Sequence, residues 1–430
     1  MNGRIAKVVG RRIWDSRGRP TIEVDVMLEG GAIGRGVAPA GASTGSAEAL
    51  ELRDGGNALG GFGVSRALAG VNGEINSALQ GMDAAGQEAI DARLMEIDGT
   101  PKAARLGANA LIATSLAVAS AAAAAARQPL WRHLAGGTEP QHLPLPEIQI
   151  FGGGAHAGRR VDVQDFMVIA VSAPDYATAL EWTAEVYRAA GDLMCDAGRL
   201  QGVADEGGWW PAFDSNEEAL EYLLRAIERA RLAPGEQMAI SLDIAASEFG
   251  RKGQYMLARD GRKLDSDGLA DMLLGWLGKF PIVSIEDPLG EDDPDGLAAF
   301  TRAAGSQVQV VGDDFLCTDA VRIATAARAG QCNCTLIKPN QIGTLTHAST
   351  AVEAARKAGW GTIVSARSGE TEDAAIAHIA VGWGIRQLKV GSFARSERMA
   401  KWNEGLRIAE TAACGGALPP RSAFPWGGRK

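Results

Sequence analysis

The sequence has few cysteines, and their spacing does not suggest a cross-linked framework. The five are odd in number and scattered through 430 residues, so a disulfide-stapled extracellular fold is not expected. Cys332 and Cys334 have one residue between them and lie in an apolar run, which is a poor spacing for zinc. We therefore expect a reduced, cytoplasmic protein without a thiolate metal site.

The sequence also lacks a surplus of positive charge. Its 43 lysines and arginines are outnumbered by 52 aspartates and glutamates, which gives a formal net charge of -9. Sequence-independent binding of nucleic acid needs a basic face, so we expect no nucleic-acid partner. The end of the chain, residues 421–430, is locally basic but short, and we expect it to be a solvated tail.

Long, strongly apolar runs are missing as well. Residues 107–126 approach membrane length, but they are mostly alanine and include Asn109, Thr114 and Ser115. Alanine provides little driving force for insertion into lipid, so a buried and closely packed helix is expected there. The first residues do not show a basic region followed by an apolar stretch, so neither a signal peptide nor a membrane partner is expected.

What the sequence does contain is two kinds of secondary-structure pattern, and its 430 residues suit two domains. Residues 21–28 alternate apolar and polar side chains, as in a half-buried antiparallel strand, and the chain then reads as helical to about residue 135. From about residue 140, apolar runs rich in β-branched residues alternate with helical stretches, which predicts a parallel sheet covered by helices. The number of runs suits a closed barrel, and an open doubly wound sheet is the alternative.

Polar residues follow the apolar runs in the second half of the chain. Because the carboxyl ends of barrel strands meet at one mouth, we expect these side chains to converge. One acidic residue after a strand more often caps the next helix, but the repeated register favours a functional site. The residues in this register are Asp243, Glu286, Asp313, Lys338, Arg367, Ser368 and Lys389.

The chemistry of this set points to one kind of reaction. Three carboxylates without histidine or cysteine are hard oxygen ligands, which favour Mg²⁺ over zinc. A lysine that is crowded by cations and partly desolvated can lose its proton near neutral pH and act as a base. A metal, a base and an anion pocket together suggest abstraction of a proton beside a carboxylate, with the metal stabilising the enediolate.

The motifs make the chain resemble the enolase family over nearly its whole length. They include, in order, DSRGRPTIEVDV, GASTG, EALELRDGG, LGANALIATSLAVA, DEGG, LDIAASEF, VSIEDP, VVGDD, LIKPNQIGTLT and RSGETED. The resemblance implies an α/β, enolase-like fold, in which an N-terminal α+β capping domain (1–135) covers a modified (β/α)₈ TIM barrel (140–430). It also implies a homo-oligomer, a dimer or larger, that acts on a small phosphorylated carboxylate.

The resemblance further implies a role for each residue that matches a motif. The first of two Mg²⁺ ions would be held by Asp243, Glu286 and Asp313. Ser43 of GASTG would help a second Mg²⁺ to bridge to the substrate phosphate. Lys338 would remove the α-proton, and Lys389 would neutralise the substrate carboxylate; a lysine base with one or two Mg²⁺ ions is the general pattern described for this superfamily.

At the other end of the substrate, the resemblance implies groups for the leaving hydroxyl and the phosphate. Glu206 of DEGG would be the acid that assists the leaving group, with His156 and Asp165 beside it. Arg367 and Ser368 would hold the phosphate, because a guanidinium fork matches phosphate oxygens. Gln164, which precedes Asp165, is placed among the substrate-binding residues.

Three departures from the family pattern gather around this pocket. Ala366 stands where the family has a histidine that faces the reacting end of the substrate. Asp165 stands where the family has glutamate, so its carboxylate is drawn back by about 1.5 Å. Arg159 adds a cation where asparagine is usual, and is placed as a ligand for an additional anionic group.

These departures predict a specialised paralogue in which the leaving-group side is rebuilt. The chain is similar in this respect to the carboxyphosphonoenolpyruvate synthases, enolase-like enzymes that join a phosphonoformate unit to a phosphoglycerate skeleton in phosphonate antibiotic biosynthesis. A phosphonate cosubstrate is therefore expected. The alternatives are a phosphopyruvate hydratase that interconverts 2-phosphoglycerate and phosphoenolpyruvate, and a binding protein that keeps the fold without catalysis.

Overall fold

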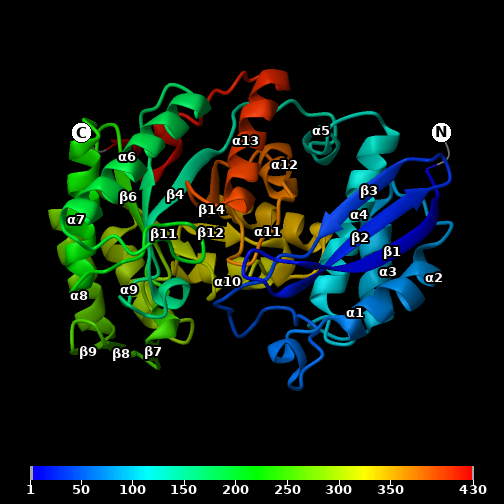
Figure 1. The fold of residues 1–430 in the computed structure, drawn as a ribbon, viewed down its shortest axis with the longest axis horizontal. Coiled ribbons are helices and arrows are strands. Elements are labelled where there is room, and N and C mark those ends of the chain that lie inside the picture. The colour runs from blue at the N-terminus through cyan, green and yellow to red at the C-terminus, as the bar shows by residue number, and fades with distance from the viewer. Residues whose placement is uncertain (1–2, 429–430) are drawn as a thin grey trace.

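The structure is a computed structural model that describes residues 3–428. Its N-terminal part is an antiparallel sheet in the order β1 (Ile5–Trp14), β2 (Pro20–Leu28) and β3 (Ile33–Val37), followed by helices (Figure 1). The helices are α1 (Ser65–Gly70), α2 (Asn76–Leu79), α3 (Gln87–Asp98), α4 (Ala108–Ala125) and α5 (Leu130–Leu134). This is the α+β arrangement predicted for the start of the chain.

Helix α4 lies very close to β3, because both surfaces are made of small residues. A Cβ atom on Gly34 would lie 2.0 Å from the nitrogen of Ala121, and one on Gly36 would lie 2.3 Å from the carbonyl oxygen of Ala113. The helix is long and apolar enough to cross a membrane, but 83% of it is buried inside the protein. The prediction of a buried, closely packed helix in this segment is confirmed.

The alternation predicted for residues 21–28 is present in β2, but the strand is not half-exposed. Asp25 on its polar face is only 5% exposed, and it is hydrogen-bonded by Arg11 and Arg35. The bond from Arg35 Nε to Asp25 Oδ1 is 2.7 Å long. Hydrogen bonds from Arg35 and Arg11 outweigh burial and lower the pKa of Asp25 to about 2. Paired charges therefore cover the face that was expected to be open.

The second part of the chain forms a closed barrel, which excludes the open doubly wound sheet. Its neighbouring strands are parallel except at β5, which runs antiparallel to both β4 and β6. In order around the barrel, the strands are β10 (Ile282–Glu286), β11 (Gln309–Gly312), β12 (Cys334–Ile337), β13 (Gly361–Ser365), β14 (Gln387–Ser392), β4 (Leu145–Gly152), β5 (Asp165–Ile169) and β6 (Ala239–Asp243). The apolar pattern does not predict the reversal of β5, which brings the first residue of this strand to the mouth.

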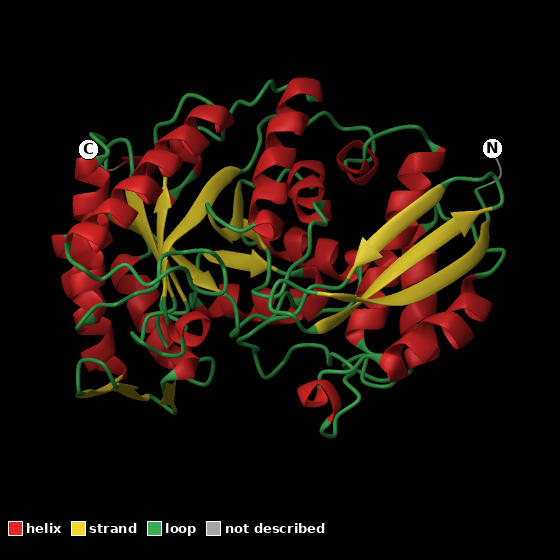
Figure 2. Cartoon of the chain, in the orientation of Figure 1, coloured by secondary structure: helices red, strands yellow, loops and turns green. Residues whose placement is uncertain are grey.

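Helices lie outside the barrel strands (Figure 2). They are α6 (Tyr176–Asp196), α7 (Asn216–Arg229), α8 (Ser266–Lys279), α9 (Pro294–Ala304), α10 (Ala320–Ala329), α11 (Leu345–Lys357), α12 (Ala375–Gly382) and α13 (Ser396–Thr411). A small antiparallel sheet of β7 (Gly250–Arg251), β8 (Gln254–Leu257) and β9 (Arg262–Asp265) follows β6. Short 3₁₀ turns over Gly154–Ala157 and Pro339–Gln341 belong to loops that reach the mouth.

The expectation of a solvated C-terminal tail was wrong for the residues that the structure describes. Phe424 and Trp426 are 7% and 1% exposed, and their stacked rings have centroids 4.4 Å apart. They form a buried cluster with Leu145, Ala239 and Val283 of the barrel strands. The expectation of a solvated tail rested on its basic residues. Burial of the Phe424 and Trp426 rings has the larger effect on the free energy of this segment.

Candidate active site

A narrow pocket lies at the mouth of the barrel, where the loop after β3 meets the strand ends. Most of the site residues predicted from the sequence line it. They are Ser43, His156, Gln164, Asp165, Glu206, Asp243, Lys338, Ala366, Arg367, Ser368 and Lys389. The register of the strand ends predicted this convergence for Asp243, Lys338, Arg367, Ser368 and Lys389, and the resemblance placed the others.

Lys389 of β14 is surrounded by carboxylates. Its Nζ lies 2.9 Å from Asp243 Oδ2, 2.8 Å from Glu286 Oε2 and 3.2 Å from Asp165 Oδ2. Burial favours the neutral amine, but Asp243 and Glu286 outweigh it and raise the pKa of Lys389 well above its usual value. Asp165 takes part because it begins an antiparallel strand and pairs with Asp243 across the ladder.

Lys338, which directly follows β12, is buried and forms an ion pair with Asp313. Burial favours the neutral amine of Lys338, but the charge of Asp313 outweighs it and raises the pKa of Lys338. This differs from the expectation of a lysine that loses its proton near neutral pH. The expectation rested on cations near Lys338, whereas the ammonium group of Lys338 contacts the carboxylate of Asp313.

The chemistry of Asp243, Glu286 and Asp313 suits a magnesium ion, and the three carboxylates stand at the ends of neighbouring strands. Asp243 and Glu286 are the last residues of the adjacent strands β6 and β10, and Asp313 directly follows the next strand, β11. Burial, and then the charge of Asp243, raise the pKa of Glu286 well above its usual value. Within residues 3–428, Glu286 Oε1 is buried and has no hydrogen-bond partner. A buried oxygen of this kind suits a hard cation.

Two tighter groups of possible ligands also lie in this region. Asp287, Asp313 and Asp314 form one of them, with ligand atoms within 4.8 Å of one another. However, the Asp287 carboxylate accepts the backbone N–H groups of Asp313 and Asp314, each at 2.9 Å, so it supports the loop that carries Asp313. The sequence argument did not single out Asp287 or Asp314, although each stands next to a predicted ligand in SIEDP and VGDD.

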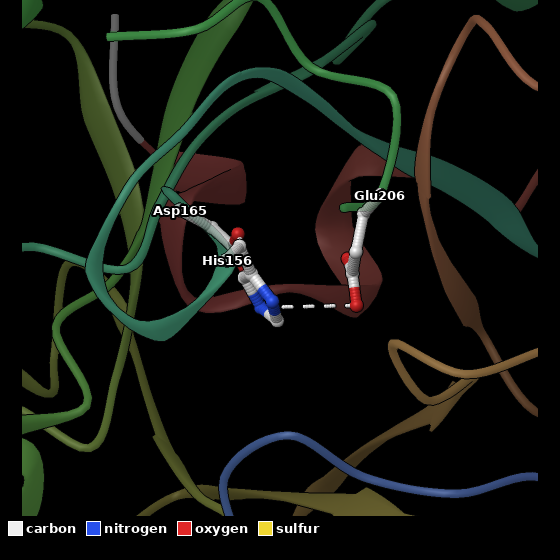
Figure 3. Close-up of side chains that lie close together, drawn as sticks. All are labelled: His156, Asp165 and Glu206. Atoms are coloured by element: carbon white, nitrogen blue, oxygen red, sulfur yellow. Dashed lines mark ion pairs between the residues drawn. The ribbon is translucent and has the colours of Figure 1, made fainter. Parts of the chain in front are cut away.

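The second group is His156, Asp165 and Glu206 (Figure 3). The His156 Nε2 lies 3.7 Å from Glu206 Oε1 and 3.8 Å from Asp165 Oδ1, and the three side chains are buried. The side-chain amide of Gln149 donates a hydrogen bond to Asp165 Oδ1 and holds that carboxylate in place. Sequence reasoning missed Gln149, because a buried glutamine inside a strand carries no motif.

Arg367 lines the pocket together with Ser43 and Ser368. Arg367 Nη1 lies 3.1 Å from Glu48 Oε2, and Arg367 Nη2 donates to the carbonyl oxygen of Ser43 at 2.9 Å. The Ser368 hydroxyl accepts a 3.1 Å bond from Arg17. Arg17 and Glu48 were not predicted, although both belong to motifs of the N-terminal part, DSRGRP and EALEL. The pocket around Arg367 is therefore built from both parts of the chain.

Two of the three departures from the family pattern lie in this pocket. Ala366 lines it, and its backbone N–H donates to the carbonyl oxygen of Lys389 at 2.9 Å. Among the pocket-lining residues in the described chain, His156 is the only histidine, so no second imidazole replaces the one missing at position 366. Gln164 lies beside Asp165 and donates to Asp243 Oδ2 at 3.1 Å.

Arg159 is the departure that the structure does not bring into the pocket. Its side chain is 68% exposed and pairs with Glu248 at 2.9 Å. Together with residues of the β7–β9 sheet, it lines a separate open groove next to the loop that carries His156. Arg159 thus lies outside the pocket, although it belongs to the same loop as His156.

Two family models match the chain and cover nearly all of it. The model described as "Enolase, N-terminal domain" matches residues 5–134. The model described as "Enolase, C-terminal TIM barrel domain" matches residues 140–418. The two matched segments correspond to the sheet-and-helix part and to the barrel, and the pocket takes residues from both.

Proposed function

The chain belongs to the enolase family, and from this premise we propose that it is a Mg²⁺-dependent enzyme that removes the α-proton of 2-phosphoglycerate or a related phosphorylated carboxylate. The observation that carries the proposal is the burial of two lysines among carboxylates at one mouth. Lys338 and Lys389 are 7% and 6% exposed. Burying such groups costs free energy, which a purely structural protein has no reason to retain.

In this proposal each lysine has a separate task. Lys389 presents its positive charge to the substrate carboxylate, and Lys338 takes the α-proton. Mg²⁺ held by Asp243, Glu286 and Asp313 would supply charge stabilisation for the enediolate when bound. Lys338 can accept a proton only after its ammonium has given one up to solvent, and the charge of Asp313 opposes that loss. A cation that engages Asp313 would weaken this opposition, so cation binding and activation of the base belong together.

The remaining pocket residues would handle the other two substrate groups. Glu206, with His156 and Asp165 beside it, would protonate or hold the leaving group. Arg367 and Ser368 would bind the phosphate. Gln164 would contact the substrate, and Ser43 would help to hold a second Mg²⁺, which would supply further positive charge near the phosphate.

We further propose that the chain is specialised toward a phosphonate-containing enolpyruvate, in the manner of a carboxyphosphonoenolpyruvate synthase. The support is that a small side chain, Ala366, lines the pocket, while Asp165 contacts Lys389. A misplacement of about 1 Å at a reacting centre can cost about 10²-fold in rate, so both changes together oppose ordinary dehydration. Arg159, in the same loop as His156, would meet the anionic group of the phosphonate cosubstrate.

Incubation with 2-phosphoglycerate and Mg²⁺, followed by enol absorbance and phosphorus NMR, tests this specialisation. We expect enol formation well below about 10 s⁻¹, the typical turnover of an enzyme, and a new phosphorus resonance only when a phosphonoformyl donor is added. Turnover at or above that rate without a cosubstrate would instead identify a phosphopyruvate hydratase. That second candidate is favoured by the presence of Lys338, Lys389, Glu206 and His156 in one pocket.

A non-catalytic binding protein is the remaining alternative. It predicts that solvent deuterium never enters the α-carbon of 2-phosphoglycerate, whereas a working base exchanges that proton even when elimination fails.

The protein is further proposed to be cytoplasmic and homo-oligomeric. Size-exclusion chromatography with light scattering would check the oligomeric state.

A further inference from the structure

Gln341 is a fully buried side chain that the proposed reaction does not use. It ends the 3₁₀ turn Pro339–Gln341, which directly follows Lys338. Its Oε1 accepts a 2.6 Å bond from the Thr318 hydroxyl, whose oxygen also accepts the backbone N–H of Lys338 at 2.9 Å. The other side of the amide faces the carboxylates of Asp313 and Glu48, which accept hydrogen bonds, so Nε2 lies on that side and Oε1 lies toward Thr318.

The Nε2 group of Gln341 connects Asp313 with Glu48, the carboxylate that pairs with Arg367. It donates to Asp313 Oδ1 at 3.0 Å and to Glu48 Oε1 at 3.1 Å. Glu48 in turn accepts from both terminal nitrogens of Arg367, at 3.1 and 3.2 Å. A continuous chain of hydrogen bonds therefore runs from Asp313, through the Gln341 amide and the Glu48 carboxylate, to the guanidinium of Arg367.

The backbone that presents Thr318 is strained. Cys317 and Thr318 have φ values of 49° and 56°, in the left-handed region that β-branched residues rarely adopt. Such conformations cost free energy and persist where the surrounding structure enforces them. Here the strain holds the hydroxyl between Lys338 and Gln341, which agrees with a demand for a fixed amide orientation.

We propose that Gln341 is a positioning residue that couples cation binding at Asp313 to anion binding at Arg367. The inference rests on the proposed function, because it takes Asp313 as a Mg²⁺ ligand and Arg367 as the phosphate ligand. The amide has one proton for each carboxylate, so a shift of Asp313 toward a cation changes the orientation of Glu48 and of the guanidinium that Glu48 holds. Coupling of this kind is reciprocal: Mg²⁺ tightens the binding of an anion by the same factor as the anion tightens the binding of Mg²⁺.

Calorimetric titration of inorganic phosphate with and without Mg²⁺ tests the proposal in the wild type and in Gln341→Met. Methionine keeps the approximate volume of the side chain and removes both donors. We expect Mg²⁺ to tighten phosphate binding by about 5- to 150-fold in the wild type, and this ratio to fall at least fivefold in the variant. The affinity for Mg²⁺ alone should change much less. A merely structural role would weaken each ligand separately and leave the ratio intact.

Gln309→Met provides a matched control. Gln309 is also a buried barrel glutamine, but it begins β11 and bonds to Gln387, at the opposite end of the strand from Asp313. If Gln341→Met does not fold, Glu48→Met removes the next acceptor of the same chain and should lower the ratio equally. An unchanged ratio in a folded variant at either position would overturn the inference.

The two proposals fail in different ways. If 2-phosphoglycerate exchanges its α-proton in the wild type and the variants keep the full coupling ratio, the inference on Gln341 is wrong and the proposed function stands. If no exchange occurs but the ratio collapses in the variants, the proposed reaction is wrong and the coupling stands.

Discussion

The outer face of the N-terminal sheet and the mouth of the barrel both bring acidic and basic side chains into contact, but under different conditions. On the sheet, Arg11 and Arg35 are 40% and 58% exposed, and their hydrogen bonds lower the pKa of Asp25. At the mouth, Lys389 and Glu286 are almost completely buried, and burial raises the pKa of Glu286. The sheet cluster therefore favours the ionised form of Asp25, whereas burial at the mouth disfavours the ionised form of Glu286.

This difference separates a stabilising cluster from a functional one. A partly exposed, well-paired carboxylate keeps much of its hydration and contributes modestly to folding. Carboxylates buried around amines lose much of their hydration, and for Glu286 this loss outweighs the attraction of Lys389, so that group is kept at a cost in stability. We expect substitutions at the mouth to change chemistry and ligand binding, and substitutions on the sheet to change stability alone.

The largest effect is expected for Lys338→Met. Loss of a general base should lower the rate of deuterium exchange at the α-carbon of 2-phosphoglycerate by about 10²- to 10⁴-fold, measured by proton NMR. Lys279→Met is the matched control, because Lys279 is 60% exposed, pairs with Glu217 and should leave exchange unchanged. Exchange that survives in the Lys338 variant would remove this lysine from the mechanism.

The next largest effect is expected for Ala366→His. If the missing imidazole limits dehydration, restoring it should raise the rate of enol formation from 2-phosphoglycerate by about 10²-fold. Ala366→Gln is the control for size, because it fills the same space without a titratable ring. Equal rates in the histidine variant and the parent would show that the gap at this position does not cause the specialisation.

A smaller effect is expected for Glu286→Gln, and it concerns the metal. Mg²⁺ at about 100 times its dissociation constant should stabilise the parent by about 2.7 kcal/mol, and the variant should lose most of this gain in thermal unfolding. Without Mg²⁺ we expect the variant to melt at or above the parent temperature, because a buried charge has been removed. Glu217→Gln, at the surface, should keep the full response to Mg²⁺. A Mg²⁺ response retained by the Glu286 variant would exclude this carboxylate as a ligand.

The smallest effect belongs to the sheet cluster and depends on pH. The folded pKa of Asp25 is about 2, below its ordinary 3.8, so its contribution is complete above the ordinary value and is lost as the pH falls toward 2. After allowance for the exposed arginines, we expect Asp25→Asn to cost about 1 kcal/mol at neutral pH and almost nothing near pH 2. Urea unfolding between these limits measures it, and a cost that does not depend on pH would contradict the assignment.

The sequence predicted the parts of the fold and site that follow from periodicity. Apolar runs ending in polar residues predicted the barrel, and their register predicted that Asp243, Lys338 and Arg367 would share a mouth. The reversal of β5 could not be predicted, because an antiparallel strand with both faces buried has the same apolar composition as a parallel one. Arg159 was placed by its position in a motif, but side-chain direction in a loop depends on packing that the motif does not contain.

The supporting residues of the site were harder to predict. Gln341, Glu48 and Gln149 act through hydrogen bonds to other side chains, so only three-dimensional contacts identify them. The raised pKa of Lys338 belongs to the same class, since it depends on one contact with Asp313. Periodicity shows which strand end a residue occupies, but it does not show which neighbour the residue touches.

A crystal structure with Mg²⁺ and 2-phosphoglycerate tests the central claim most directly, through the distance from Lys338 Nζ to the α-carbon. The account predicts that the ammonium leaves Asp313 and that the nitrogen lies within about 3.5 Å of that carbon, a distance from which a proton can be transferred. A complex in which Lys338 stays paired with Asp313, or in which the carbon lies beyond its reach, would contradict it.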